Sequence, residues 1–150
     1  MRSLQQWLDL YAQSHQHPTN KRIHWVAVPG ILLTVVALLW WLPTPWQDPS
    51  LNWATLAVVP AALFYLRLSR VLGFSMIILL ALCLMLVSWA SQHLPLLEVA
   101  LSLFVLLWIA QFIGHHIEGK KPSFFQDLAF LLIGPAWVVH HLLSRLGIRC

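Results

Sequence analysis

Residues 71–90 read VLGFSMIILLALCLMLVSWA, and this run contains no Asp, Glu, Lys or Arg. An α-helix needs about 20 predominantly apolar residues to cross the hydrocarbon core of a bilayer. The run therefore predicts a transmembrane helix. Three more apolar runs occupy residues 26–42, 51–66 and 94–113. Together the runs predict an all-α integral membrane protein whose fold is a four-transmembrane-helix bundle.

The composition supports the same class of protein. Hydrophobic residues make up 59% of the 150 residues, and only 9% are charged, whereas an ordinary soluble domain has about 25% charged residues. These values exclude a water-soluble globule and a disordered chain. The net charge of +4 comes from basic residues scattered between apolar runs, so no nucleic-acid partner is expected. We expect a single membrane-embedded domain over residues 1–150, in contact with membrane lipids. The sequence does not specify its oligomeric state.

An amphipathic segment precedes the first span. Its apolar residues share the i, i+3, i+4, i+7 spacing of one helix face: Leu4, Trp7, Leu8 and Tyr11. We therefore expect an N-terminal amphipathic helix over residues 3–14 that lies on the membrane surface. The alternative is a cytosolic helix packed on the loops, because periodicity does not distinguish the two.

The last apolar run, residues 128–139, is too short to cross a bilayer and contains Gly134 and Pro135. It predicts a C-terminal re-entrant or interfacial helical hairpin. The alternative is a fifth span over residues 128–146, which would bury two histidines.

Basic residues set the expected orientation. Seven of them fall on one side of the predicted spans, and the opposite loops contain none: Arg2, Lys21, Arg22, Arg67, Arg70, Lys120 and Lys121. By the positive-inside rule this side is cytoplasmic. A C-terminal hairpin would place Arg145 and Arg149 there as well, which favours it over a fifth span. We expect a multi-pass protein of a bacterial inner membrane with a cytoplasmic N-terminus, since the chain carries no retention signal.

Histidines gather at the same predicted interface. The chain has eight histidines, and only His93 falls at the far side. The others are His15, His17, His24, His115, His116, His140 and His141. Several histidines with a carboxylate fit non-haem iron best, and Glu118 shares a helix face with His115. A metal site is one interpretation, and ordinary interfacial histidines are the other. Asn20 either orients a ligand or caps the first span.

Two stretches carry a more specific pattern. Residues 11–30 read YAQSHQHPTNKRIHWVAVPG, and residues 111–137 read QFIGHHIEGKKPSFFQDLAFLLIGPAW. Their motifs, HxxPxNxxIH and QFIGHxxE, resemble the signatures of the 2-hydroxy fatty acid dioxygenase-like family, and the resemblance covers nearly the whole chain. The matching residues are His15, Asn20 and His24 in the first motif and Gln111, Gly114, His115 and Glu118 in the second.

The resemblance implies an Fe2+-dependent dioxygenase of fatty acid alpha-oxidation. Such an enzyme converts a 2-hydroxy fatty acid and O2 to the fatty acid one carbon shorter. The iron ligands implied are His15, His24, His115 and either His140 or His141, with Glu118 as a further ligand or as a residue that orients one. By the same resemblance, His24, His115 and Glu118 would be catalytic. We also expect Asn20, Lys21 and Lys120 to bind or steer the anionic substrate.

Two other functions remain open on the sequence alone. One is a non-catalytic metal- or lipid-binding membrane protein that keeps the site without turnover. The other is a small transporter, which requires a polar path along the spans. Glu98 is the only carboxylate within the predicted spans and lies near a helix end, so an ion or proton relay is disfavoured.

Overall fold

The structure is a computed structural model that describes every residue except 1, 47, 49–50 and 126. Within the described residues it contains six α-helices, one short 3-10 helix and no strands. The helices are α1 (Leu4–Ala12), α2 (Pro18–Trp41), α3 (Trp53–Leu68), α4 (Arg70–His93), α5 (Leu96–Glu118), η1 (Ser123–Phe125) and α6 (Phe130–Arg145). The prediction of an all-helical protein is confirmed.

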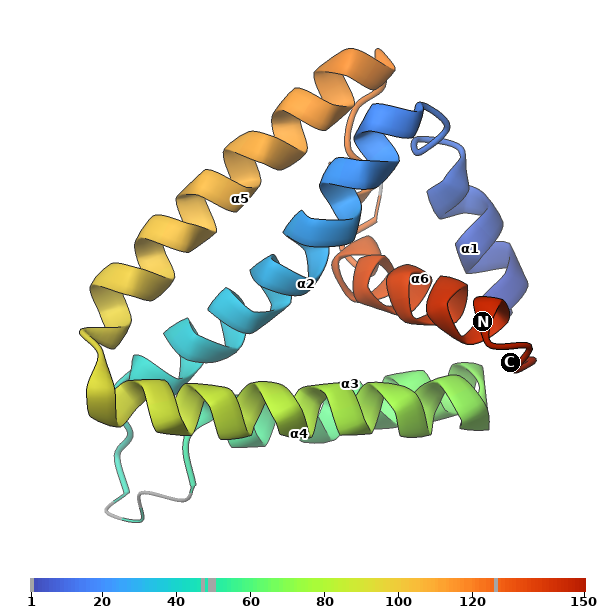
Figure 1. Cartoon of the computed structure of the whole chain (residues 1–150). Helices are drawn as coiled ribbons and strands as arrows, with labels where there is room; N and C mark the ends of the chain where they lie inside the picture. Colours follow the sequence, from blue (N-terminus) through green and yellow to red (C-terminus); the bar gives the residue numbers. More distant parts are fainter. Residues whose placement is uncertain (1, 47, 49–50, 126) are drawn as a thin grey trace.

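The four helices that correspond to the predicted spans, α2 to α5, form two antiparallel pairs. The two pairs diverge like the arms of a V (Figure 1). α2 packs along α5 in one arm, and α3 packs along α4 in the other. The arms meet where α4 passes into α5, and α1 and α6 fill the open end. This arrangement differs from the expected four-helix bundle, because α6 packs between the arms and contacts both α2 and α4.

A single residue reverses the chain between α3 and α4. The N–H of Ser69 donates to the carbonyl of Tyr65, and its hydroxyl accepts from the N–H of Leu72. Gly73 then allows the two helices to approach, because a Cβ there would lie 2.7 Å from the Cα of Leu66. The tight turn explains why α3 and α4 remain a close pair.

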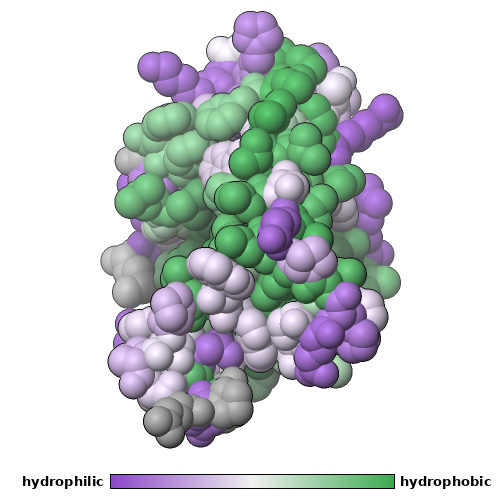
Figure 2. Space-filling model, turned by 90° about the vertical axis from the view of Figure 1, so that its left-hand side faces the viewer, coloured by the Kyte–Doolittle hydropathy of each residue, from purple (hydrophilic) through white to green (hydrophobic). Residues whose placement is uncertain are grey.

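Three helices, α2, α4 and α5, are long and apolar enough to cross a membrane. α3 is apolar but has only 16 residues, which corresponds to about 24 Å of helix against a hydrocarbon core of about 30 Å. Among the described residues, three of the four predicted spans are therefore helices long enough to cross a membrane, and α3 is shorter. On the face shown in Figure 2, hydrophobic residues cover much of the upper and middle part, interrupted by a few hydrophilic residues, and hydrophilic residues gather at the top and in the lower part. α5 in particular exposes large apolar side chains such as Leu106 and Ile109, as expected of a surface that meets lipid.

The C-terminal segment is one continuous helix, which corrects the expected hairpin. Gly134 and Pro135 both lie inside α6. Pro135 lacks the N–H that would bond to the carbonyl of Leu131, and the helix nevertheless continues past it. The other backbone N–H and C=O groups need hydrogen-bond partners in these apolar surroundings, and a continuous helix provides them. α2 and α3 likewise continue through their internal prolines, Pro29 and Pro60.

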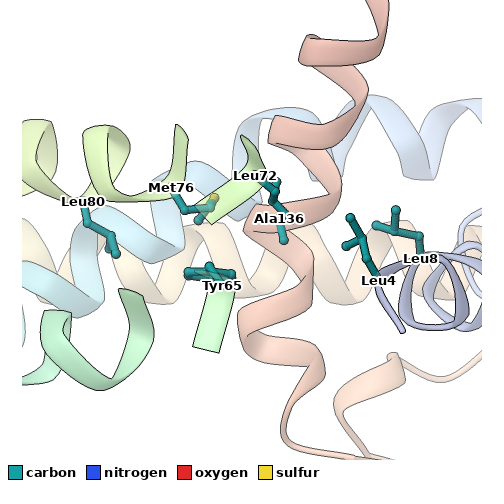
Figure 3. Packing of buried hydrophobic residues seen from close by; sticks show 7 residues of the cluster. All are labelled: Leu4, Leu8, Tyr65, Leu72, Met76, Leu80 and Ala136. Carbon is teal, nitrogen blue, oxygen red and sulfur yellow. The ribbon is translucent and has the colours of Figure 1, made fainter. Parts of the chain in front are cut away.

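The N-terminal helix is covered by protein. A capping box between Ser3 and Gln6 starts α1. Its apolar residues Leu4, Trp7, Leu8 and Tyr11 are all buried. Leu4 and Leu8 join Ala136 of α6 and residues of α3 and α4 in one core cluster (Figure 3). The predicted amphipathic helix is present, but its apolar face contacts α6 instead of lying on the membrane surface.

Candidate metal centre

The turn between α1 and α2 places the first two histidines of the motif. α1 ends at Ala12, and α2 begins at Pro18, since proline is well accommodated at the first helical position. The side chain of His17 caps α2 by accepting from the N–H of Thr19. His15 therefore lies in the turn, and His24 lies in the second turn of α2.

The antiparallel packing of α2 and α5 brings His115, near the end of α5, to the same place. One ring nitrogen from each of His15, His24 and His115 lies within 4.8 Å of the other two, and all three residues are buried. Ring centroids are separated by 4.3 Å between His15 and His24 and by 4.8 Å between His24 and His115. Among the described residues, these three histidines are the possible metal ligands that the fold brings together in a group.

Backbone carbonyls determine which ring nitrogen of His15 and of His24 is free to bind a metal. His15 Nδ1 lies 2.6 Å from the carbonyl oxygen of Tyr11, and His24 Nδ1 lies 3.0 Å from that of Asn20. A carbonyl oxygen can only accept, so each Nδ1 carries the proton and donates it. Each Nε2 then keeps an unprotonated lone pair. Hydrogen bonds of this kind orient the metal-binding histidines of proteins.

The buried nitrogens of this group fit a metal ion. His15 Nε2 and His115 Nδ1 are buried and have no hydrogen-bond partner among the described residues, although buried polar atoms in native proteins are nearly always satisfied. Nitrogen ligands at about 2.0–2.1 Å from a tetrahedral metal are about 3.4 Å apart. The ligand nitrogens, now within 4.8 Å of one another, would need to move closer by up to about 1.4 Å. Three imidazoles suit zinc, copper and iron.

The surroundings of His15 keep its ring neutral. Burial lowers the pKa of His15 to about 4. The ring also stacks on Tyr11, with centroids 4.0 Å apart. His15 is therefore uncharged near pH 7, in the form that binds a metal.

Glu118 joins the end of α5 to the turn before α2. Its Oε1 accepts from the N–H of Gln16, and its Oε2 accepts from the N–H of His17 and from Nδ2 of Asn20. Asn20 Nδ2 also donates to the carbonyl of Ser14. Both carboxylate oxygens thus hold the turn in place, and Glu118 lies outside the histidine group.

Asn20 and Gly114, two further motif residues, pack directly against each other. Asn20 is fully buried. A Cβ at position 114 would overlap Asn20 Oδ1. Glycine at 114 therefore lets α5 approach α2 closely enough to bring His115 beside His24.

The two C-terminal histidines lie elsewhere. The ring of His141 contacts Trp25 and Trp137, with centroids 5.1 Å and 6.2 Å away. Neither His140 nor His141 belongs to the histidine group. The expectation that one of them completes the ligand set stays a prediction, and the structure instead places the ring of His141 against the two tryptophans.

Of the two lysines expected to steer the substrate, Lys21 is near enough to affect the pKa of His15, and Lys120 is tied to the turn after α1. Lys120 Nζ donates to the carbonyl of Gln13 at 2.6 Å. The charge of Lys21 contributes to the lowered pKa of His15. Lys21 therefore supplies positive charge near the buried imidazole of His15.

A cavity of about 280 Å³ adjoins the three histidines. Its lining follows the seam between α2 and α5: Val28, Ile31 and Val35 from α2, and Gln111, Trp108 and Phe104 from α5. On both helices these residues lie 4, 7 and 11 positions from the histidine, so the cavity extends along about three helical turns, or about 16 Å. Sequence reasoning missed the cavity, although this shared spacing from His24 and His115 was the signal for it.

Comparisons with known proteins identify the family. The family model described as "2-hydroxy-palmitic acid dioxygenase Mpo1-like" matches residues 1–146. The chain is 31% identical over 147 residues to the 2-hydroxy-palmitic acid dioxygenase MPO1 of Saccharomyces cerevisiae, and the alignment covers 96% of this chain and 82% of the yeast protein. No solved structure matches. The family model spans almost the entire chain, so the chain belongs to the 2-hydroxy-palmitic acid dioxygenase Mpo1-like family.

Proposed function

We propose that this protein is an Fe2+-dependent dioxygenase that converts a 2-hydroxy fatty acid and O2 to the fatty acid one carbon shorter, CO2 and water. The observation that carries the proposal is the position of the three buried histidines at one end of a long apolar cavity. The family and the name of the yeast relative support the substrate class and the type of reaction.

In this proposal His15, His24 and His115 hold the metal. The backbone carbonyls of Tyr11 and Asn20 accept hydrogen bonds from Nδ1 of His15 and His24. These bonds leave each Nε2 unprotonated and able to bind the metal. When bound, iron would supply a centre that coordinates the 2-hydroxyl and the carboxylate of the substrate and reacts with O2.

The chain's other residues bind and shield the substrate. Apolar side chains along α2 and α5 receive the acyl tail and exclude water from the buried end of the cavity. Lys21 and Lys120 attract the carboxylate by their charge. A fatty acid is a membrane-soluble molecule, and the apolar outer faces of the helices support access from the lipid.

We further propose that the protein resides in a bacterial inner membrane with the histidine end facing the cytoplasm. Basic residues lie in the segments around that end, including Lys21, Arg22, Lys120 and Lys121, and the turns at the opposite ends of α2 and α5 contain no Lys or Arg. This distribution follows the positive-inside rule.

Metal analysis and O2 uptake together test the proposal. Protein purified in detergent without oxygen should contain one or two equivalents of iron per chain and should consume O2 when 2-hydroxypalmitic acid is added. The single variants His15→Ala, His24→Ala and His115→Ala should lose the iron and the uptake.

His140→Ala and His141→Ala are the matched controls, because both histidines lie outside the group. Each should keep its iron and its activity. Full iron content in all three site variants would refute the ligand assignment. Stoichiometric iron without O2 uptake in the wild-type protein would refute the enzymatic function and indicate a non-catalytic metal- or lipid-binding protein.

A further inference from the structure

Gln111 is a polar residue in an otherwise apolar cavity wall. It lies one helical turn before His115 on α5 and lines the cavity. Its side-chain oxygen, Oε1, is buried and has no hydrogen-bond partner among the described residues. Burying a carbonyl group without a donor is destabilising, and native proteins contain few such groups. Gln111 thus lacks a partner that a bound molecule could provide.

The missing partner must be a hydrogen-bond donor, because an amide oxygen only accepts. The neighbouring side chains of α2, Val28 and Ile31, are hydrocarbon and cannot donate. An ionised fatty acid without substituents has only acceptor oxygens. A 2-hydroxy fatty acid carries one donor, the hydroxyl group on the carbon next to the carboxylate.

We propose that Gln111 accepts a hydrogen bond from the 2-hydroxyl of the substrate and thereby selects 2-hydroxy fatty acids over unsubstituted ones. The inference rests on the proposed function and assigns a specificity-determining residue to it. Gln111 lies between the histidines and the apolar part of the cavity, where the head group of an acid meets its tail. A site that hydrogen-bonds a substrate hydroxyl rejects the analogue that lacks it.

Equilibrium binding without turnover tests the inference. Dissociation constants for 2-hydroxypalmitic acid and palmitic acid are measured by calorimetry on metal-loaded protein in detergent, without oxygen. The wild-type protein should prefer the 2-hydroxy acid. Gln111→Met, which keeps the length of the side chain and removes the acceptor, should reduce this preference about tenfold, the usual effect of losing one hydrogen bond. Its affinity for palmitic acid and its metal content should stay close to wild type.

Three variants serve as controls. Gln111→Glu keeps an acceptor oxygen and should retain the preference, although charge repulsion weakens the binding of both acids. Trp108→Phe removes an unpartnered N–H donor from the same wall and leaves in place the acceptor of Gln111, to which the inference attributes the preference. It should therefore change both dissociation constants alike. Gln92→Met alters an exposed glutamine of α4 and should change neither.

A preference in Gln111→Met within twofold of wild type would overturn the inference. A wild-type protein that binds neither acid, or both equally, would overturn it too. A wild-type protein whose preference depends on Gln111 but that consumes no O2 would refute the proposed function and leave the inference standing.

Discussion

Glu118 holds its carboxylate against the turn that carries His15. It accepts two hydrogen bonds from backbone N–H groups, those of Gln16 and His17, and a third from the buried amide of Asn20. Hydrogen bonds to an ionised acceptor are stronger than neutral ones, so these contacts fix the turn firmly. We therefore expect Glu118 to influence metal binding by positioning His15 and His24.

Glu118→Gln replaces one accepting oxygen with an NH2 group, which cannot accept from the backbone. We expect the metal affinity to fall about 10–100-fold, the usual cost of losing a residue that orients a ligand. Metal titration of protein purified without oxygen measures this change, with His115→Ala as the reference for a lost ligand. A loss in Glu118→Gln as complete as in His115→Ala would make Glu118 a ligand.

Part of this centre could be predicted from the sequence. The predicted topology placed His15, His24 and His115 at one membrane interface, the family resemblance implied that they share one site, and the structure brings the three imidazoles together. Their role as metal ligands stays a prediction. The location of His140 and His141 could not be predicted, because it depends on whether the chain turns or continues at Gly134 and Pro135.

Among the elements, α1 has the most direct link to the centre, since His15 follows it and Tyr11 on its last turn stacks on His15. α1 is held mainly by apolar contacts with α6. Trp7 meets the ring of Phe130 edge-on at 5.1 Å, and Leu8 lies in the cluster with Ala136. The position of His15 therefore depends on how well α1 packs.

Leu8→Ala tests this packing. Leu8 is only 5% exposed, and truncating a buried leucine typically costs about 2–5 kcal/mol. We expect Leu8→Ala to lower the free energy of unfolding in detergent by an amount in this range. The control is Gln5→Ala, an exposed position on the same helix, with an expected change within about 0.5 kcal/mol. If α1 instead contacted lipid through this face, Leu8→Ala would leave the unfolding energy unchanged and weaken membrane association.

The periodicity of α1 predicted its existence and its buried face but not what covers that face. Leu4, Trp7, Leu8 and Tyr11 satisfy the same spacing on a membrane surface or on another helix. The covering element, α6, carries small residues at the contact, and a Cβ at Gly134 would lie 3.1 Å from the hydroxyl of Tyr11. Such a close approach depends on tertiary packing, which local patterns do not encode.

In the whole molecule, the histidine group lies at one end of α2 and α5, and the junction with the α3–α4 arm lies at the other (Figure 1). The apolar runs predicted the spans, and the basic residues predicted which ends lie together. The V shape could not be predicted, because it depends on α6 and α1 packing between the arms at their open end. This packing closes the buried end of the cavity with Phe130 and Pro135.

The two native cysteines can test the proposed orientation. Cys150 is exposed and Cys83 is buried in α4, and the C-terminus lies at the open end of the V (Figure 1). If this end faces the cytoplasm, a membrane-impermeant maleimide should modify Cys150 only after the cells are permeabilised. A cysteine introduced as Gln92→Cys, at the exposed opposite end of α4, should react in intact cells. Cys83 should stay unmodified in both conditions, because the reagent cannot reach a buried thiol. Modification of Cys150 in intact cells, together with protection of Gln92→Cys, would reverse the orientation and place the histidine centre outside the cytoplasm.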